Sequence, residues 1–545
     1  MSGWLQRRFR HEVDFWSTST ALLALLILVP LAAVLVGLGR TGPEWSHIAE
    51  TVLNTYVLNT LVLIATVSVL SLLMALPTAW LVAAFEFPGR RFFEWALILP
   101  LAIPTYVAAF AYMKVPEAAI PLLVGIRNSF GPETYVQAEL LLRYGLLSLL
   151  LAGVLYPYVF ISARASFSRQ QGSVIEAAQI LGRRPGAVFL TIALPLARPA
   201  IVAGLSLTIM EVVNDYGAVH FFGVPTLTEG IFRTWFGLGD RASAVRLAGI
   251  VMVVIFVFLV GERLQRGRAR FAEDSTHARP LARRRLSPGR GVLATLLCLG
   301  PLCIGFLIPF LQLLYWAFGL DGPRLLRSWQ HLGNSMWLSL ATAAVVTLIA
   351  LVFAYAWKLH NVRWLRTLGR LATMGYAVPG AVVALGVMLC LGWLDERLSG
   401  WGGRFGLPVV FLSGTVLAIG FAYVVRFLAV SFQPMHAGME RICGSLDEAS
   451  RVLGKPPLAT LWRVNLPLLR GTMLAALMLV FVDILKELPL TLILRPANFE
   501  TLATIAFGMA SEGRIQESAL PSLLIILLGA TGLMLLNRFM AGSAK

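Results

Sequence analysis

The sequence is poor in charge and in cysteine. Only 13% of its 545 residues are Asp, Glu, Lys or Arg, whereas 58% are hydrophobic. Soluble domains carry about a quarter charged residues, so the composition excludes a soluble protein and indicates a polytopic membrane protein. The four cysteines, Cys298, Cys303, Cys390 and Cys443, lie in or beside apolar runs without metal-ligand spacing. We interpret them as packing residues.

Two chemical motifs are also missing. The chain has no G-x-x-x-x-G-K-[ST] phosphate loop, so we do not expect it to hydrolyse nucleotides or to be an enzyme. No cluster of His and Cys is present that would store a metal. A single histidine, His220, follows an expected span, and we interpret it as a hydrogen-bonded loop residue.

Apolar runs long enough to cross a bilayer, which takes about 20 helical residues, recur from end to end. The expected spans are 15–39, 51–85, 95–113, 144–163, 242–261, 291–320, 332–357, 371–394, 405–425 and 518–537. Two further spans, starting near Pro199 and Gly471, are interrupted by carboxylates. The first run is too long for a cleaved signal peptide. The prediction is therefore an all-α polytopic fold with about 12 transmembrane helices.

The formal charge of +17 is interpreted as a topology signal. With the N-terminus in the cytoplasm, most of the 45 Lys and Arg fall in cytoplasmic segments, as the positive-inside rule requires. The densest run, residues 263–290, holds nine arginines. Arg426 and Lys486 fall within spans. We therefore expect the lipid bilayer as a partner and no nucleic acid.

The chain is a tandem repeat. Residues 176–195 read EAAQILGRRPGAVFLTIALP and residues 448–467 read EASRVLGKPPLATLWRVNLP. Upstream matches, such as Asn59 with Asn334, keep nearly the same offset. Six spans in each half make the halves parallel repeats. The predicted boundaries are a first half at 1–262, an Arg-rich cytoplasmic linker at 263–290 without packed structure, and a second half at 291–545.

The repeated segments share the pattern E-A-A, three residues, G, nine residues, I-x-L-P. The first copy has Glu176, Ala177, Ala178, Gly182, Ile192, Leu194 and Pro195. The second has Glu448, Ala449 and Gly454, with Ser450 and Val464 as its two departures. A short helix that ends at a glycine with positive φ, followed by a second helix, predicts a protruding helix-turn-helix. We call residues 176–195 and 448–467 the signature loops.

This pattern resembles the signature of ABC importer permeases. The resemblance implies that Glu176, Ala177, Ala178, Gly182, Glu448, Ala449 and Gly454 couple the chain to a cytoplasmic ABC ATPase dimer. It also implies a periplasmic solute-binding protein, and a multi-pass location in the bacterial inner membrane with both termini cytoplasmic. The chain itself would bind no cofactor, because ATP and Mg belong to the partner ATPase. The alternative for the loops is an amphipathic connector on the membrane surface.

The fifth and eleventh spans carry equivalent carboxylate pairs, Glu211 with Asp215 and Asp483 with Glu487. At about 1.5 Å per residue, the first of each pair lies roughly 18 Å into its span. A spacing of four predicts that both members share one helical face, and charges at this depth normally face a cavity. We therefore predict a translocation path lined by all four carboxylates. The alternative is a structural role, with Asp483 or Glu487 held by Lys486.

An acidic path suits a cationic solute. The segments NDYGAVHFFGVPTLTEGIFRTWFG, from Asn214, and KELPLTLILRPANFETLATIAFG, from Lys486, are similar to the corresponding stretches of fused ferric-iron permeases. That resemblance implies transport of Fe(III), a hard cation that favours oxygen ligands, but it assigns no metal ligands. Permeases for thiamine, polyamine or aminoalkylphosphonate remain alternatives. A 12-helix secondary transporter, from another class, gives no reason for duplicated signature loops.

Overall fold

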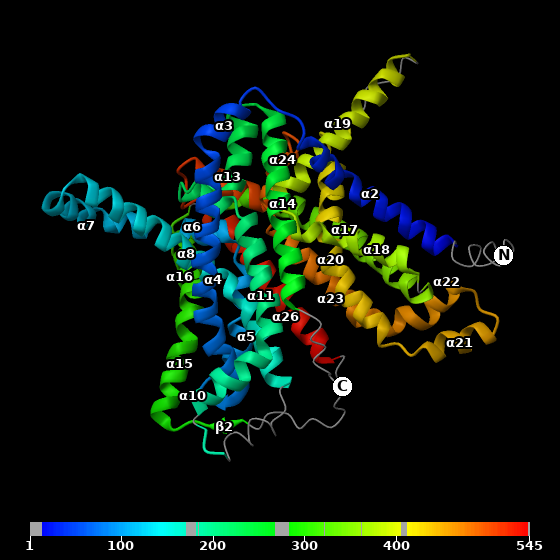
Figure 1. The fold of residues 1–545 in the computed structure, drawn as a ribbon, viewed down its shortest axis with the longest axis horizontal. Helices are drawn as coiled ribbons and strands as arrows, with labels where there is room; N and C mark the ends of the chain where they lie inside the picture. The colour runs from blue at the N-terminus through cyan, green and yellow to red at the C-terminus, as the bar shows by residue number, and fades with distance from the viewer. Residues whose placement is uncertain are drawn as a thin grey trace.

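The computed structural model describes residues 14–169, 181–183, 185–266, 283–320, 322–360, 362–404 and 411–542. Within these ranges the fold is helical, as the sequence predicts, apart from one short strand pair. That pair joins β1 (Phe85–Glu86) to β2 (Arg284–Arg285) in parallel register. The helices lie in two bundles that separate toward one end of the molecule (Figure 1).

Within its described residues, the first half of the chain forms fifteen helical elements. Its helices are α2 (Phe15–Gly37), α3 (Trp45–Thr51), α4 (Leu53–Ala84), α5 (Arg90–Ala96), η1 (Leu99–Ala102), α6 (Thr105–Tyr112), α7 (Lys114–Phe130), α8 (Pro132–Arg169), α10 (Pro185–Val188), η2 (Phe189–Ala193), α11 (Leu194–Asn214), α12 (Gly217–Phe221), α13 (Leu227–Phe232), η3 (Arg233–Gly237) and α14 (Arg241–Arg266). The chain passes from η2 into α11 without a break, so the fifth span starts before Pro199, where the sequence analysis placed it.

The second half of the chain repeats this order. Its helices are α15 (Pro288–Leu302), η4 (Cys303–Leu307), α16 (Ile308–Phe318), α17 (Gly322–Leu359), α18 (Arg363–Ala372), η5 (Thr373–Ala377), α19 (Gly380–Arg404), α20 (Val416–Glu440), α21 (Gly444–Val452), α22 (Pro457–Thr460), η6 (Leu461–Asn465), α23 (Leu466–Leu485), α24 (Pro489–Leu494), α25 (Leu502–Ser511) and α26 (Ala519–Gly542). The eleventh span likewise starts before Gly471.

Among the described residues, nine helices are long and apolar enough to cross a membrane, and eleven if each of two bent helix pairs counts as one span. The twelfth predicted span corresponds to α26, whose apolar part, Ala519–Leu535, is a shorter helix. The polytopic all-α prediction is therefore confirmed.

The third and ninth spans are broken, although the sequence analysis treated them as continuous. The axes turn by 90° between η1 and α6 and by 118° between η5 and α19. Ile103 and Val378, at the breaks, are extended, with ψ of 119° and 131°. Each precedes a proline, which disfavours helical backbone in the residue before it. The first break, from Ile103 to Thr105, lines a cavity between the two halves, and Tyr376, just before the second break, also lines it.

The tenth predicted span, 405–425, begins too early. Its helix α20 starts at Val416, after a turn held by Asp395. The Asp395 carboxylate accepts hydrogen bonds from the amides of Leu412 and Ser413, at 2.6 and 2.9 Å. Because these bonds belong to a turn, the apolar residues before Val416 do not extend the helix.

The first span of each half packs on the other half. α2 contacts α17, α18 and α19, while α15, η4 and α16 contact α4, α6 and α8 (Figure 1). His360 Nε2 lies 2.9 Å from the Asp14 carboxylate at the start of α2. Burial opposes ionisation of Asp14, but the Ser17 amide and His360 hold its pKa below the usual value. The exchanged spans interlock the two halves.

Equivalent hydrogen bonds hold the same loop in each half. An asparagine near the start of the second span donates to a backbone carbonyl, and the hydroxyl that follows it accepts from a helix amide. The bonds are Asn59 to Pro225 (2.9 Å), Asn334 to Glu500 (3.2 Å), Leu227 to Thr60 (3.1 Å) and Leu502 to Ser335 (2.7 Å). The duplication seen in the sequence is therefore a duplication of structure.

Two expectations for individual segments are wrong. The end of the Arg-rich linker is packed, because β2 pairs with β1 and Arg283 lies 3.8 Å from Glu86. Most of that linker lies outside the described residues. Cys443 is exposed, so it is not a packing residue, whereas Cys298 is buried.

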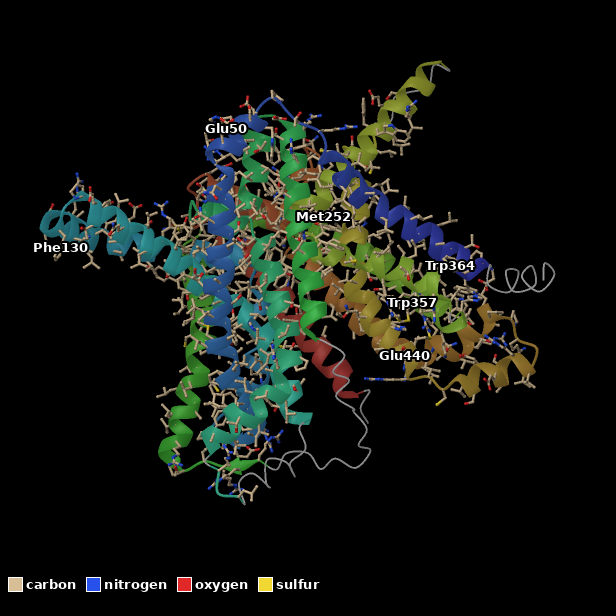
Figure 2. All side chains as sticks on the ribbon, viewed as in Figure 1. Glu50, Phe130, Met252, Trp357, Trp364 and Glu440 are labelled. Carbon is tan, nitrogen blue, oxygen red and sulfur yellow. The ribbon has the colours of Figure 1, made fainter. Side chains whose placement is uncertain are left out.

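The signature loops mark one end of the molecule. Figure 2 shows Glu440, at the end of α20 next to the second signature loop, and Glu50, on α3 at the opposite end. We call the end that carries α3, α13 and α25 the distal end. Phe130 lies at the tip of the α7–α8 hairpin, which projects sideways from the other helices (Figure 2).

Candidate functional site

A cavity of about 80 Å³ lies between the two halves. It forms where α11 and α23 end and where the third and ninth spans break. Its polar and aromatic lining consists of Thr105, Tyr106, Tyr158, Glu211, Asn214, Asp215, Tyr216, Tyr376, Arg426, Phe427, Asp483, Lys486 and Glu487. All four carboxylates predicted from the sequence therefore border one central space.

The carboxylates of each pair do not share a helical face, contrary to the sequence analysis. α11 ends at Asn214, and Asp215 already has extended backbone with ψ of 123°. α23 ends at Leu485, so Glu487 also lies beyond its helix. The spacing-of-four argument fails because it requires a continuous helix through both positions.

The second carboxylate of each pair instead caps the next helix. Asp215 Oδ1 accepts hydrogen bonds from the amides of Ala218 and Val219, at 3.0 and 3.1 Å, at the start of α12. Glu487 Oε1 accepts one from the amide of Leu490, at 3.2 Å, at the start of α24. Both residues are only 6% exposed. A carboxylate at this position satisfies amides that have no partner within the helix.

Two cations reach the same cavity. Arg426 Nη2 lies 3.5 Å from Glu487 Oε2, and Arg426 is only 3% exposed. Lys486 Nζ lies 2.9 Å from Asp483 Oδ1. Lys486 therefore contacts Asp483, as the structural alternative from the sequence suggested, whereas Glu487 pairs with Arg426. Two of the four carboxylates thus have a cationic partner.

Glu211 differs from the other three carboxylates. It lines the cavity, yet it forms neither a hydrogen bond nor an ion pair with any residue in the described ranges. Asp483 is paired with a lysine, and Asp215 and Glu487 cap helices. Among the four carboxylates, Glu211 is therefore the one without a hydrogen-bond or ion-pair partner in the described part of the chain.

Asn214 joins the halves beside this cavity. Its Oδ1 accepts hydrogen bonds from the amide of Gly380, at 2.8 Å, and from Arg426 Nη1, at 3.0 Å. A Cβ atom on Gly380 would lie 2.4 Å from both Arg426 Nη1 and Glu487 Oε1. A larger residue at position 380 would therefore have to displace the charged groups of this ion pair.

Aromatic rings from both halves cluster next to Tyr106 and Tyr216 of the cavity lining. Phe507 of α25 lies 6.4 Å from Phe110 and 6.5 Å from Tyr106, between ring centroids. Its ring is also 5.6 Å from that of Tyr216. The sequence analysis gave these aromatic residues no role, and nothing in their spacing identifies them.

The second signature loop forms the predicted helix-turn-helix. α21 carries Glu448 and Ala449, the turn contains Gly454 with φ of 72°, and α22 follows. Glu448 is exposed, as are the apolar side chains of Val452 (87%) and Leu453 (76%). The loop thus offers a mixed acidic and apolar surface.

Polar contacts tie this loop to α17. Lys358 Nζ lies 2.6 Å from Asp447 Oδ2 and 3.0 Å from Asn465 Oδ1. Asn465 donates to Asp447 at 3.0 Å, and the Tyr355 hydroxyl donates to the Pro457 carbonyl at 2.7 Å. A displacement of the loop would therefore be transmitted to the span.

The first signature loop is described only in part. Glu176, Ala177 and Ala178 lie outside the described residues, while Gly182 has the predicted positive φ, 80°. Aromatic rings pack against the described part of this loop. The Trp80 ring lies 5.3 Å from that of Phe167 and 5.4 Å from that of Phe189.

His220 lies outside the cavity lining. Its Nδ1 is 3.9 Å from Glu229 Oε1, and its ring stacks on Tyr216 at 5.1 Å. No group of three or more His, Cys, Asp or Glu that could hold a metal occurs among the described residues.

Comparison with known proteins matches two parts of this chain, residues 68–268 and 346–544, to the family described as "Binding-protein-dependent transport system inner membrane component". Both matches omit the exchanged first spans. The chain is 24% identical to the Fe(3+)-transport system permease protein FbpB 2 of Haemophilus influenzae, covering 96% of this chain and 98% of that protein.

Two other relatives have a similar sequence identity to this chain. The ferric transport system permease protein FbpB of Actinobacillus pleuropneumoniae is 22% identical over 94% of this chain and 76% of its own length. The sulfate transport system permease protein CysT of Escherichia coli is 26% identical over 37% of this chain and 72% of its own length.

Proposed function

Because the chain belongs to the family of binding-protein-dependent transport system inner membrane components, and is thus a non-catalytic ABC importer permease, we propose that its solute is Fe(III). A periplasmic binding protein delivers the ion at the distal end, and a cytoplasmic ATPase dimer acts on the signature loops. Both termini lie in the cytoplasm. The domain boundaries at 262 and 290 separate the two permease halves.

The observation that carries this proposal is that Glu211 lines the cavity without a hydrogen bond or an ion pair to any residue in the described ranges. A hard trivalent cation prefers carboxylate oxygen among protein ligands. The other carboxylates keep the passage acidic without forming a cage, and a passage must bind weakly enough to release its ion. Similarity along the whole chain to a permease named for Fe(3+) transport supports the same solute.

The signature loops are the proposed ATPase contacts. Glu448, Ala449 and Gly454 lie on the exposed second loop, and their equivalents Glu176, Ala177, Ala178 and Gly182 belong to the first. Closure of the ATPase dimer draws the loops together. The motion reaches the cavity through α17 and α23 in the second half.

Copurification tests the loop assignment. Glu448→Arg should reduce the amount of ATPase retained on the purified permease by about tenfold, because it places a cation on the proposed contact. Glu440→Arg makes the same charge change on the exposed end of α20 and should retain the ATPase. Equal retention by both variants would leave the loop without a docking role.

Uptake by proteoliposomes tests the solute. The permease, its ATPase and its binding protein are reconstituted, and labelled Fe(III), thiamine, putrescine, 2-aminoethylphosphonate and sulfate are compared with and without ATP. Accumulation of Fe(III) alone, dependent on ATP, is the expected result. ATP-dependent accumulation of another solute would retain the importer and replace its substrate. Accumulation without ATP would point to a secondary transporter.

Sulfate is included because Arg426 and Lys486 border the cavity and a sulfate permease is among the relatives. Both cations already have carboxylate partners, which leaves them less available to an anion than Glu211 is to a cation. An oxyanion is therefore the second candidate solute.

A further inference from the structure

A second cavity lies on the membrane-facing surface, apart from the translocation cavity. Its volume is about 640 Å³, and it lies between α2, α14 and α19 toward the distal end. Its walls are mainly apolar, and they include Val29, Ala33, Val245, Leu389, Leu394 and Phe421. Because α2 is the exchanged first span, this groove follows the contact between the two halves.

The groove opens toward lipid. Val29 and Val36 of α2 and Trp393 of α19 line it, and each of these side chains is more than half exposed. All three belong to segments that cross the membrane. An apolar cavity in this position is filled by hydrocarbon rather than by water.

The distal rim of the groove carries two arginines. Arg40 follows the end of α2, and Arg241 begins α14. Neither forms an ion pair with a residue in the described ranges. The nearby Asp240 carboxylate accepts hydrogen bonds from Ser243 and from the Glu44 amide, so it is occupied elsewhere.

The internal repeat provides a counterpart of about 380 Å³ between α6, α7, α16 and the α25–α26 turn. Its cations are neutralised within the chain. Lys114 lies 2.9 Å from Glu117, and Arg514 pairs with both Glu512 and Glu517. The two rims therefore differ in charge pairing. The cations of the counterpart have carboxylate partners, whereas Arg40 and Arg241 have none among the described residues.

We infer that the groove between α2, α14 and α19 binds an anionic glycerophospholipid of the leaflet at the distal end. One acyl chain fills the apolar cavity, and the phosphate lies between Arg40 and Arg241. Trp393 stands at the headgroup level, where tryptophan is favoured. The inference requires only that the spans cross a membrane, so it does not depend on the solute.

Lipid retention tests this site. The full chain with its ATPase is placed in nanodiscs with equal amounts of phosphatidylglycerol and phosphatidylethanolamine, extracted mildly, and its retained lipids are counted by mass spectrometry. Wild type should retain phosphatidylglycerol preferentially. Arg40→Gln with Arg241→Gln should reduce that preference by about fivefold for each arginine, and roughly thirtyfold in total.

The counterpart supplies a matched control. Lys114→Gln with Arg514→Gln removes the two cations of the counterpart and should keep the wild-type preference. A wild type that retains both lipids in the proportion supplied would overturn the site, as would an Arg40 and Arg241 variant with unchanged preference. Ala33→Phe narrows the groove and should lower retention of phosphatidylglycerol while both arginines remain. Monodisperse elution with bound ATPase establishes that each variant is folded.

Discussion

The two halves share hydrogen bonds between side chains and the backbone but differ in their ion pairs. Asn59 and Asn334 make equivalent bonds, and Asp215 and Glu487 cap equivalent helices. However, Glu487 pairs with Arg426. In the first half Val154 stands at the position equivalent to Arg426, and Asp215 forms no ion pair with a residue in the described ranges. Geometry is repeated, while the ion pairs are confined to the second half of the cavity.

The signature loops differ in the same way. Lys358, Asp447 and Asn465 hold the second loop, but the first half has Ala83, Ile175 and Ala193 at these positions. In the first half, the rings of Trp80, Phe167 and Phe189 pack together at the described part of the loop. The comparison teaches that two repeats can keep one architecture with different chemistry, because the architecture depends mainly on backbone bonds and helix packing.

The largest difference in stability between the two halves is expected at the capping carboxylates, Asp215 and Glu487. Arg426→Met leaves Glu487 buried without its cation, which costs about 3–5 kcal/mol for a buried pair. Asp215→Asn removes no cation partner and should cost about 1–2 kcal/mol through weaker hydrogen bonds. Unfolding of the detergent-solubilised protein measures both. Equal losses would show that the ion pair adds nothing, and adding Glu487→Gln to Arg426→Met should recover most of the stability.

The loop anchors should respond unequally as well. Lys358→Met removes a half-buried, charge-assisted contact worth about 1.5–3 kcal/mol, so the amides of α21 should exchange hydrogen at least about tenfold faster. Lys455→Met removes an exposed lysine from the same loop and should leave exchange unchanged. Faster exchange in the first signature loop would indicate that the two anchors are coupled rather than separate.

Within the cavity, Glu211 and its repeat equivalent Asp483 should not be interchangeable. Glu211→Gln removes the unpaired carboxylate and should slow ATP-driven uptake by about tenfold, or ~1.4 kcal/mol. Asp483→Asn with Lys486→Met removes an internally neutral pair and should slow uptake by less than about twofold. Initial uptake rates measure both. The opposite order would assign solute contact to the second half.

The smallest effects test the shared geometry. Asn59→Ala and Asn334→Ala each remove one side-chain hydrogen bond to a carbonyl and should each cost about 1 kcal/mol. Unfolding measurements should give losses that agree within a few tenths of a kcal/mol. A clear difference would mean that equivalent bonds are supported differently in the two halves.

Much of the fold follows from the sequence, because a membrane span is a local property. Apolar length identified most helices, and the repeated E-A-A pattern predicted the positive φ of Gly182 and Gly454. The broken spans were missed because apolar length does not show where a helix bends. The early end of α11 was missed for the same reason, although Asp215 can cap a helix as well as extend one.

The cavity could be predicted only in part. The four carboxylates were identified as charges at membrane depth, and Arg426 and Lys486 were visible for the same reason. Their partners were not, since Arg426 meets Asn214 from the other half of the chain. Sequence order carries no record of such a contact without knowledge of how the halves pack. The coupling and path roles of these residues therefore stay predictions.

The exchanged first spans also set an order for biosynthesis. α2 leaves the ribosome early, yet α18 and α19, against which it packs, are translated only after the first half is complete. At about 5–20 residues per second, this delay lasts tens of seconds. During that time α2 is held in lipid without its neighbours from the second half, so the N-terminal half cannot finish assembly before the C-terminal half begins to insert.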